Sequence, residues 1–192
     1  MSISLSKGGT ISLTKEAPGL TRVTAGLGWE SRGSAGAADL DASVIVCDAN
    51  GRCLADNWFI FYGHLVSPMQ AVQHMGDELE GGDGDDDDEE IRVDLSLLPP
   101  EAQRLVFVVS IYEADVRRQN FGQVQKAYIR MVDAATNREV LRYDLAEDYS
   151  TETSMVFGEL YRLGSDWKFR AIGQGYQGGL ADVIRDYGLN AS

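Results

Sequence analysis

This sequence of 192 residues has few cysteines, histidines and prolines, and it has no long apolar run. Two cysteines, Cys47 and Cys53, are too few to staple a domain of this size, and we expect both to be reduced thiols in a cytosol. The two histidines, His64 and His74, lie ten residues apart without cysteines at zinc spacing, so no zinc site is predicted. No apolar stretch approaches the ~20 residues that cross a bilayer, and the first residues lack the apolar segment of a secretory signal. We therefore expect a cytoplasmic protein without direct membrane insertion.

Basic residues are also scarce, with 17 Lys and Arg against 30 Asp and Glu and a net charge of −13. Ten of the acidic residues fall between Gly76 and Glu90, a stretch without Lys or Arg, and they account for all but three of the net negative charges. The acidity is thus a local feature. Because a chain this acidic repels phosphate backbones, nucleic acid is not expected as a partner.

Short alternating and β-branched segments recur along the chain and predict strand after strand. The clearest are residues 43–47, 59–62, 91–95, 105–112, 128–132, 140–143, 155–163 and 167–173. The dipeptide Asn50-Gly51 is a strong hairpin signal, and Cys47 and Cys53 flank this predicted turn and could approach across it.

Helical signals are rare. Leu180, Val183, Ile184 and Tyr187 recur at helical spacing with Gly188 behind them, which predicts one amphipathic helix near the C-terminus. The prolines in residues 99–102 suit the start of a short turn. The predicted fold class is all-β, a β-sandwich with one or two short helices, formed as a single domain over residues 1–192.

The acidic run at residues 76–90 predicts a cation site. So many carboxylates in one loop repel one another, and a bound divalent ion would relieve that repulsion. Calcium takes 6–8 oxygen ligands in flexible geometry, which suits this loop better than magnesium does. The spacing is not that of an EF-hand, because position six of that pattern would be Asp88 instead of glycine. A solvated or disordered acidic segment that binds nothing specific is the alternative.

A second acidic cluster precedes the strand at residues 43–47. Asp39 and Asp41 are two residues apart, and in extended backbone such residues point to the same side. Both carboxylates could therefore face one ion at the end of the sandwich. The alternative is that they only solubilise the entry to a strand.

A set of short strings spans the whole chain, at residues 6–9, 26–29, 39–43, 59–62, 76–77 with the acidic loop, 118–124, 150–162 and 167–176. Together these strings resemble the TerD family of tellurium-resistance proteins. The resemblance implies a β-sandwich that binds calcium between acidic loops at one end, in bacterial cytoplasm, with a link to tellurite and other stresses. It implies no established enzymatic activity. Family members also resemble a eukaryotic calcium-binding protein that binds cyclic AMP, so a messenger-like ligand stays open.

The predicted metal ligands are Asp39, Asp41, Asp77, Asp85, Asp86, Asp87, Asp88 and Glu89, with Ca²⁺ as the ion. The expected partners are calcium and other proteins of the same resistance system. Departures from the family pattern fall nearby, at Ala37 and at residues 62–64 and 67–70. A metal-assisted phosphoester hydrolase, a tellurite reductase that uses the thiols, and a scaffold in a membrane-associated complex are the alternative functions.

Overall fold

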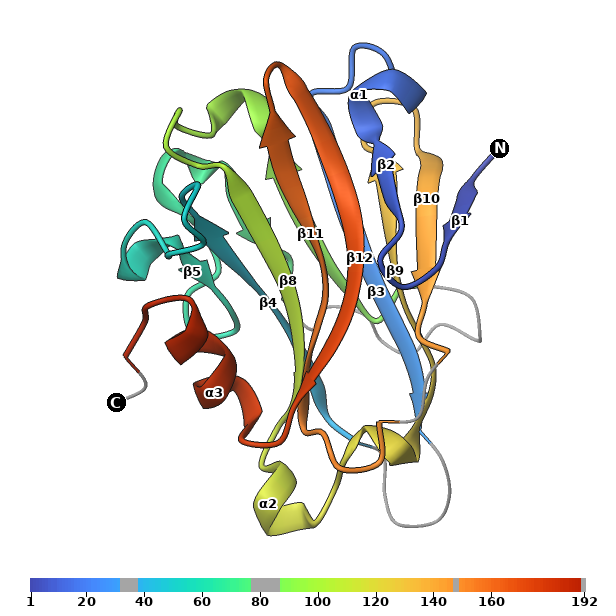
Figure 1. The fold of residues 1–192 in the computed structure, drawn as a ribbon, viewed down its shortest axis with the longest axis vertical. Coiled ribbons are helices and arrows are strands. Elements are labelled where there is room, and N and C mark those ends of the chain that lie inside the picture. The colour runs from blue at the N-terminus through green and yellow to red at the C-terminus, as the bar shows by residue number, and fades with distance from the viewer. Residues whose placement is uncertain (32–37, 77–86, 147–148, 191–192) are drawn as a thin grey trace.

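The structure is a computed structural model that describes residues 1–31, 38–76, 87–146 and 149–190. In this part of the chain two six-stranded sheets lie face to face (Figure 1). Sheet A has the order β1 (Ile3–Leu5), β10 (Arg138–Asp144), β9 (Val124–Asp133), β3 (Arg22–Ser31), β7 (Glu89–Asp94) and β6 (Val72–His74). Sheet B has the order β2 (Thr10–Ser12), β12 (Asp166–Tyr176), β11 (Ser154–Leu163), β8 (Arg104–Ile111), β4 (Leu40–Cys47) and β5 (Phe59–Ile60). All neighbouring strands run antiparallel except β1 and β10.

Helices are short and lie at the periphery. The α-helices are α1 (Leu13–Glu16), α2 (Ala114–Arg117) and α3 (Gly179–Asp186). The 3₁₀ turns are η1 (Asp56–Trp58), η2 (Pro68–Gln70), η3 (Leu95–Leu97) and η4 (Phe121–Gln123). Figure 1 shows α3 outside the strands of sheet B, and α2 at the end of the sandwich where β8 finishes.

The burial pattern of each strand follows from what covers its two faces. In β7, Ile91 and Val93 are buried in the core, whereas Arg92 between them is exposed, because the outer face of sheet A meets solvent. In β8 nearly every residue is buried, because one face packs into the core and α3 covers the other. Phe107 belongs to the core and its neighbour Val106 to the cluster under α3.

Helix α3 forms as its apolar spacing predicts. Val183 and Ile184 pack against Val156 and the outer residues of β4 and β8. Gly188 has φ +81°, a conformation that favours glycine, and it ends the helix as the N–H of Leu189 donates to the carbonyl of Ile184. The helix therefore gives sheet B a second, smaller apolar cluster.

The predicted all-β fold class and the C-terminal helix are confirmed. Each predicted segment contains a strand, although β5 ends at Ile60 and β9 begins at Val124, and residues 99–102 form a turn. The largest miss is β3, a ten-residue strand in the middle of sheet A. Glycines at 26 and 28 lower its strand propensity, and the tertiary structure uses them for close packing.

Candidate functional site at the acidic end of the sandwich

The two acidic clusters lie at the same end of the sandwich. Strand β3 ends there beside the start of β7, since Leu27 pairs with Glu89. Strand β4 also begins there, because the backbone N–H of Ala42 donates to the Glu89 carboxylate. The acidic run connects β6 to β7, whose facing ends are joined by the bond from the Met75 N–H to the Glu90 carbonyl.

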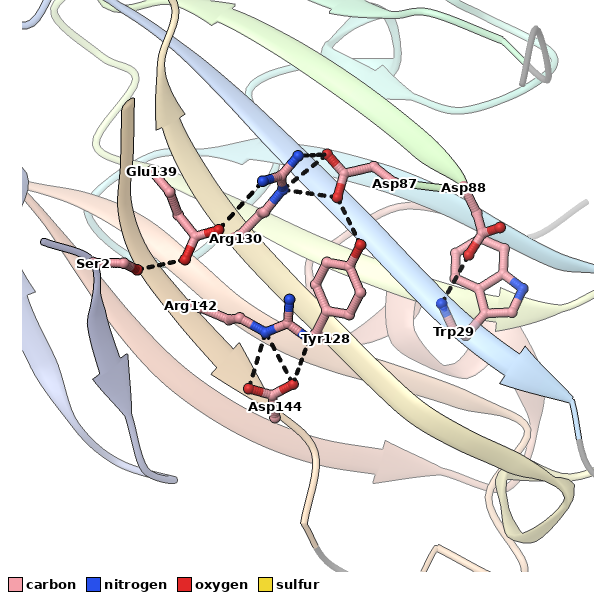
Figure 2. A network of polar contacts seen from close by, with 9 residues as sticks. All are labelled: Ser2, Trp29, Asp87, Asp88, Tyr128, Arg130, Glu139, Arg142 and Asp144. Carbon is pink, nitrogen blue, oxygen red and sulfur yellow. Dashed lines mark hydrogen bonds and ion pairs between the residues drawn. The ribbon is translucent and has the colours of Figure 1, made fainter. Parts of the chain in front are cut away.

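Asp87 lies on the outer face of sheet A, in an ion pair that the sequence did not predict. Arg130 on β9 donates from Nε to both carboxylate oxygens, at 2.9 and 3.0 Å, and from Nη2 at 2.9 Å (Figure 2). The hydroxyl of Tyr128 donates to Oδ1 at 2.9 Å. The Asp87 side chain is 3% exposed and that of Arg130 30%. The charge of Asp87 is therefore neutralised by the protein itself.

Two glycines of β3 make room for this network. A Cβ atom on Gly26 would come within 2.0 Å of the Asp87 carboxylate, and one on Gly28 within 2.4 Å of the Tyr128 ring. Gly26 pairs with Arg130 and Gly28 with Tyr128, so the two strands are in register for this packing. The glycines that make β3 hard to predict thus leave the space that the Asp87–Arg130 ion pair and Tyr128 occupy.

Burial and neighbouring charges determine the protonation states of Tyr128 and Arg130. Burial, followed by the charge of Asp87, raises the pKa of the Tyr128 hydroxyl. The hydrogen bonds to Asp87 raise the pKa of the Arg130 guanidinium, against the effect of burial. Arg142 lies over the Tyr128 ring at 3.8 Å. Tyr128 is accordingly a neutral donor and Arg130 a cation at any ordinary pH.

The side chain of Asp88 points away from Arg130 and accepts a hydrogen bond from the Trp29 N–H at 2.8 Å (Figure 2). Burial raises the pKa of its carboxyl and the charge of Asp87 raises it further, while the Trp29 bond acts against both. A pKa above the unfolded value means that the native state holds this proton more tightly than the unfolded chain does. Asp88 therefore stabilises the fold at low pH, and this contribution is lost as the pH rises through the native pKa.

Replacing Asp88 with asparagine is expected to raise the melting temperature at pH 7, because the amide stays neutral and keeps an oxygen for Trp29. The gain should shrink as the pH falls and vanish below about pH 4, where the wild-type carboxyl is also protonated. Melting curves recorded in chelator from about pH 3 to pH 8 measure it. A difference that does not change with pH would contradict the assignment.

Glu89 faces inward, with a nearly buried side chain that contacts both sheets. It accepts from the N–H of Ala42, and the Nε2 atom of His74 lies 3.5 Å from the same oxygen. His74 Nε2 also lies 3.1 Å from the Ala42 carbonyl, and its Nδ1 accepts from the Gly76 N–H, which places the proton on Nε2. At Ala42, β4 pairs with β8 on one side, whereas on the other side its pairing with β5 covers only Val44 and Ile45. Glu89 and His74 thus meet the polar groups of an otherwise open strand edge.

Asp39 and Asp41 lie at the start of β4. They alternate with Leu40 and Ala42, which are in the core, so both carboxylates point away from it. The Asp39 side chain is exposed, and its carbonyl accepts from the N–H of Tyr112 at the end of β8. Asp41 is half-buried and pairs with Ser110.

The structure therefore sorts the predicted ligands into groups. Asp39 and Asp41 lie where β4 begins and point away from the core. Asp87 and Glu89 point to opposite faces of sheet A and have protein partners, and Asp88 accepts from the Trp29 N–H. Asp77, Asp85 and Asp86 lie outside the described residues. Among the residues that the structure describes, no three Asp, Glu, His or Cys side chains gather closely enough to hold a metal ion.

Arg130 and Tyr128 are the main residues that sequence reasoning missed. Their alternation within β9 indicates that both point to the same face, and this signal is visible in the sequence. Nothing in the sequence says which of the ten acidic residues of the loop they contact.

The fold and its acidic end define the class of this protein as a two-sheet β-sandwich with carboxylates gathered where β4 and β7 begin. The model of the TerD domain matches residues 1–187. The chain belongs to the TerD family.

Known relatives that are similar to this chain carry the names of resistance and stress proteins. The chain is 52% identical to tellurium resistance protein TerD of Serratia marcescens, with 100% of both chains covered. It is 50% identical to general stress protein 16U of Bacillus subtilis, with 98% of both covered. The solved structure of a TerD homologue from Streptomyces coelicolor matches 90% of this chain and 100% of its own with a TM-score of 0.68, at 22% identity, which supports the fold alone. These relatives are named as resistance or stress proteins, and the family is one of tellurium and chemical resistance.

No helix in the described residues has the length and apolar character to cross a bilayer.

Proposed function

We propose that this chain is a non-catalytic, calcium-binding stress protein of the cytoplasm. In this proposal, carboxylates at the acidic end hold Ca²⁺, and the ion orders the loops there into a surface that other proteins of the same resistance system bind. The ligands would be Asp39 and Asp41 with Asp77, Asp85 and Asp86. Asp87, Asp88 and Glu89, which have protein partners, would instead hold the end of the sheet in place.

One observation carries the proposal. The outward-pointing Asp39 and Asp41 lie at the same end of the sandwich as the β6–β7 connection, which holds six acidic residues between positions 77 and 86. Calcium accepts carboxylate, carbonyl and water oxygens in flexible geometry, and this suits ligands drawn from two loops. The absence of lysine and arginine from residues 76–90 leaves the charge of that connection without a local counter-ion in the sequence.

Calorimetry with calcium tests the proposal on the full chain. We expect the wild type to bind, and Asp39→Asn with Asp41→Asn to lose at least tenfold in affinity. The matched control, Glu101→Gln with Asp166→Asn, removes the same charge at the opposite end, before β8 and in the β11–β12 turn, and should bind like the wild type. Asp87→Asn should also keep its calcium affinity, since Arg130 already neutralises that carboxylate.

Thermal unfolding gives an independent measurement. Because the ion binds the native state, calcium at about 100 times Kd should stabilise the wild type by roughly 2.7 kcal/mol. The double variant at positions 39 and 41 should gain at most about 1.4 kcal/mol at the same calcium concentration, because a tenfold weaker affinity leaves calcium at about 10 times its Kd. A wild type that is equally stable in chelator and in calcium would overturn the proposal.

A further inference from the structure

Cys47 and Cys53 face each other across the hairpin that follows β4. The two residues form an isolated antiparallel bridge. The neighbouring pairs on either side carry the hydrogen bonds, from the Asp48 N–H to the Arg52 carbonyl at 2.8 Å and from the Leu54 N–H to the Val46 carbonyl at 3.1 Å. The cysteines therefore occupy a non-hydrogen-bonded position of the ladder.

This position brings two side chains together. Residues opposite each other in a non-hydrogen-bonded pair have Cα atoms about 4.5 Å apart and side chains on the same face. A disulfide requires Cα atoms at about 4.4–6.8 Å, so a pair of this kind lies within the range that a disulfide can join. The Cys53 thiol also adds to the effects that raise the pKa of Cys47, as expected of two close sulfur atoms.

The two thiols differ in access. Cys47 is buried in the cluster between sheet B and α3, whereas Cys53 is half-buried at its edge. The Cys53 thiol donates to the Ala55 carbonyl at 3.2 Å, and its backbone N–H donates to the carbonyl of Tyr187 just after α3. A small reagent would reach Cys53 first, with Cys47 directly behind it.

We propose that Cys47 and Cys53 form a dithiol site that low-molecular-weight disulfides oxidise to an internal disulfide. The Cys53 thiol loses its proton and attacks one sulfur of the reagent, whose S–S bond breaks and releases one thiol. Cys47 then loses its proton and attacks the Cys53 sulfur, which forms the Cys47–Cys53 bond and releases the second thiol. In total the protein loses two protons and two electrons, and the reagent gains both.

The surroundings set how fast this site responds. Burial raises the pKa of the Cys53 thiol to about 11 and that of Cys47 further. Because the thiolate is the nucleophile, only on the order of one Cys53 thiol in ten thousand is reactive at pH 7. The small thiolate fraction slows the first step at neutral pH, and the rate should rise with pH. This chemistry is independent of the proposed calcium function and involves none of its residues.

The test treats the native full-length protein with glutathione disulfide at pH 8 and follows its intact mass after acid quenching. The wild type should lose two hydrogen atoms and retain no glutathione, and peptide mapping without reductant should find residues 47 and 53 linked. Cys47→Ala should instead accumulate a glutathione adduct on Cys53, at least tenfold more than the wild type. Cys53→Ser should leave Cys47 unmodified in the native state.

Each outcome decides the question. A stable glutathione adduct on wild-type Cys53, or cysteines that react only as fast as the whole protein unfolds, would overturn the proposal. The wild-type measurement decides it even if a variant fails to fold, which melting curves would reveal. Repeating it in chelator should change nothing, so a failure here is distinct from a failure of calcium binding.

Discussion

Replacement of Arg130 with methionine is expected to lower the free energy of unfolding by about 3–5 kcal/mol, because it leaves the buried carboxylate of Asp87 without its cation. Arg130 contributes three of the hydrogen bonds to that carboxylate, and the side chain of Asp87 is only 3% exposed. Tyr128 alone would remain as a donor to it among the bonds described. Urea unfolding at pH 7 in chelator measures the loss.

Removing both charges separates the ion pair from simple packing. The double variant Asp87→Asn with Arg130→Met should recover part of the lost stability, since no uncompensated charge then remains. Arg130→Lys should fall between the wild type and Arg130→Met, because lysine keeps the charge without the planar fork. An Arg130→Met protein within about 1 kcal/mol of the wild type would show that solvent already screens this pair.

Replacement of Glu89 with alanine is expected to lower the free energy of unfolding by about 2–4 kcal/mol. The change removes the acceptor of the Ala42 N–H, and an unsatisfied buried donor costs about 1–3 kcal/mol. It also opens a space between the sheets beside His74. Glu89→Gln keeps an oxygen that can accept from Ala42 and is expected to lose much less.

Hydrogen exchange gives this prediction a local measurement. The Ala42 amide is buried in the wild type and should exchange far more slowly than in Glu89→Ala. The amide of Val46 near the other end of β4 serves as the internal control and should change only by the global loss of stability. Equal changes at both amides would mean that Glu89 does not hold this edge specifically.

These contacts give the acidic end two kinds of carboxylate. Asp87 and Glu89 are satisfied by Arg130, Tyr128 and the backbone of β4, so they hold the strands in position. Asp39 is exposed just before β4, and the remaining acidic residues of the β6–β7 connection lie outside the described residues. The calcium proposal therefore depends on the second kind. Variants of the first kind should change stability more than calcium affinity.

The sequence alone determined the fold class, the strands with strong β signals and helix α3. These features depend on local periodicity, since alternation in β7 and helical spacing in residues 180–187 decide which side chains can share an apolar face. The family was also visible in the sequence, because its strings extend along the chain and the TerD domain covers residues 1–187.

The tertiary structure decided which polar groups meet. Asp87 and Arg130 are 43 residues apart, and their contact depends on the register of β3 with β9 and on the missing side chain of Gly26. Glu89 and Ala42 belong to different sheets, so only the packing of one sheet on the other brings them together. A sequence shows where acidic residues are concentrated, but the partner of each one is set by long-range strand pairing, which local patterns do not encode.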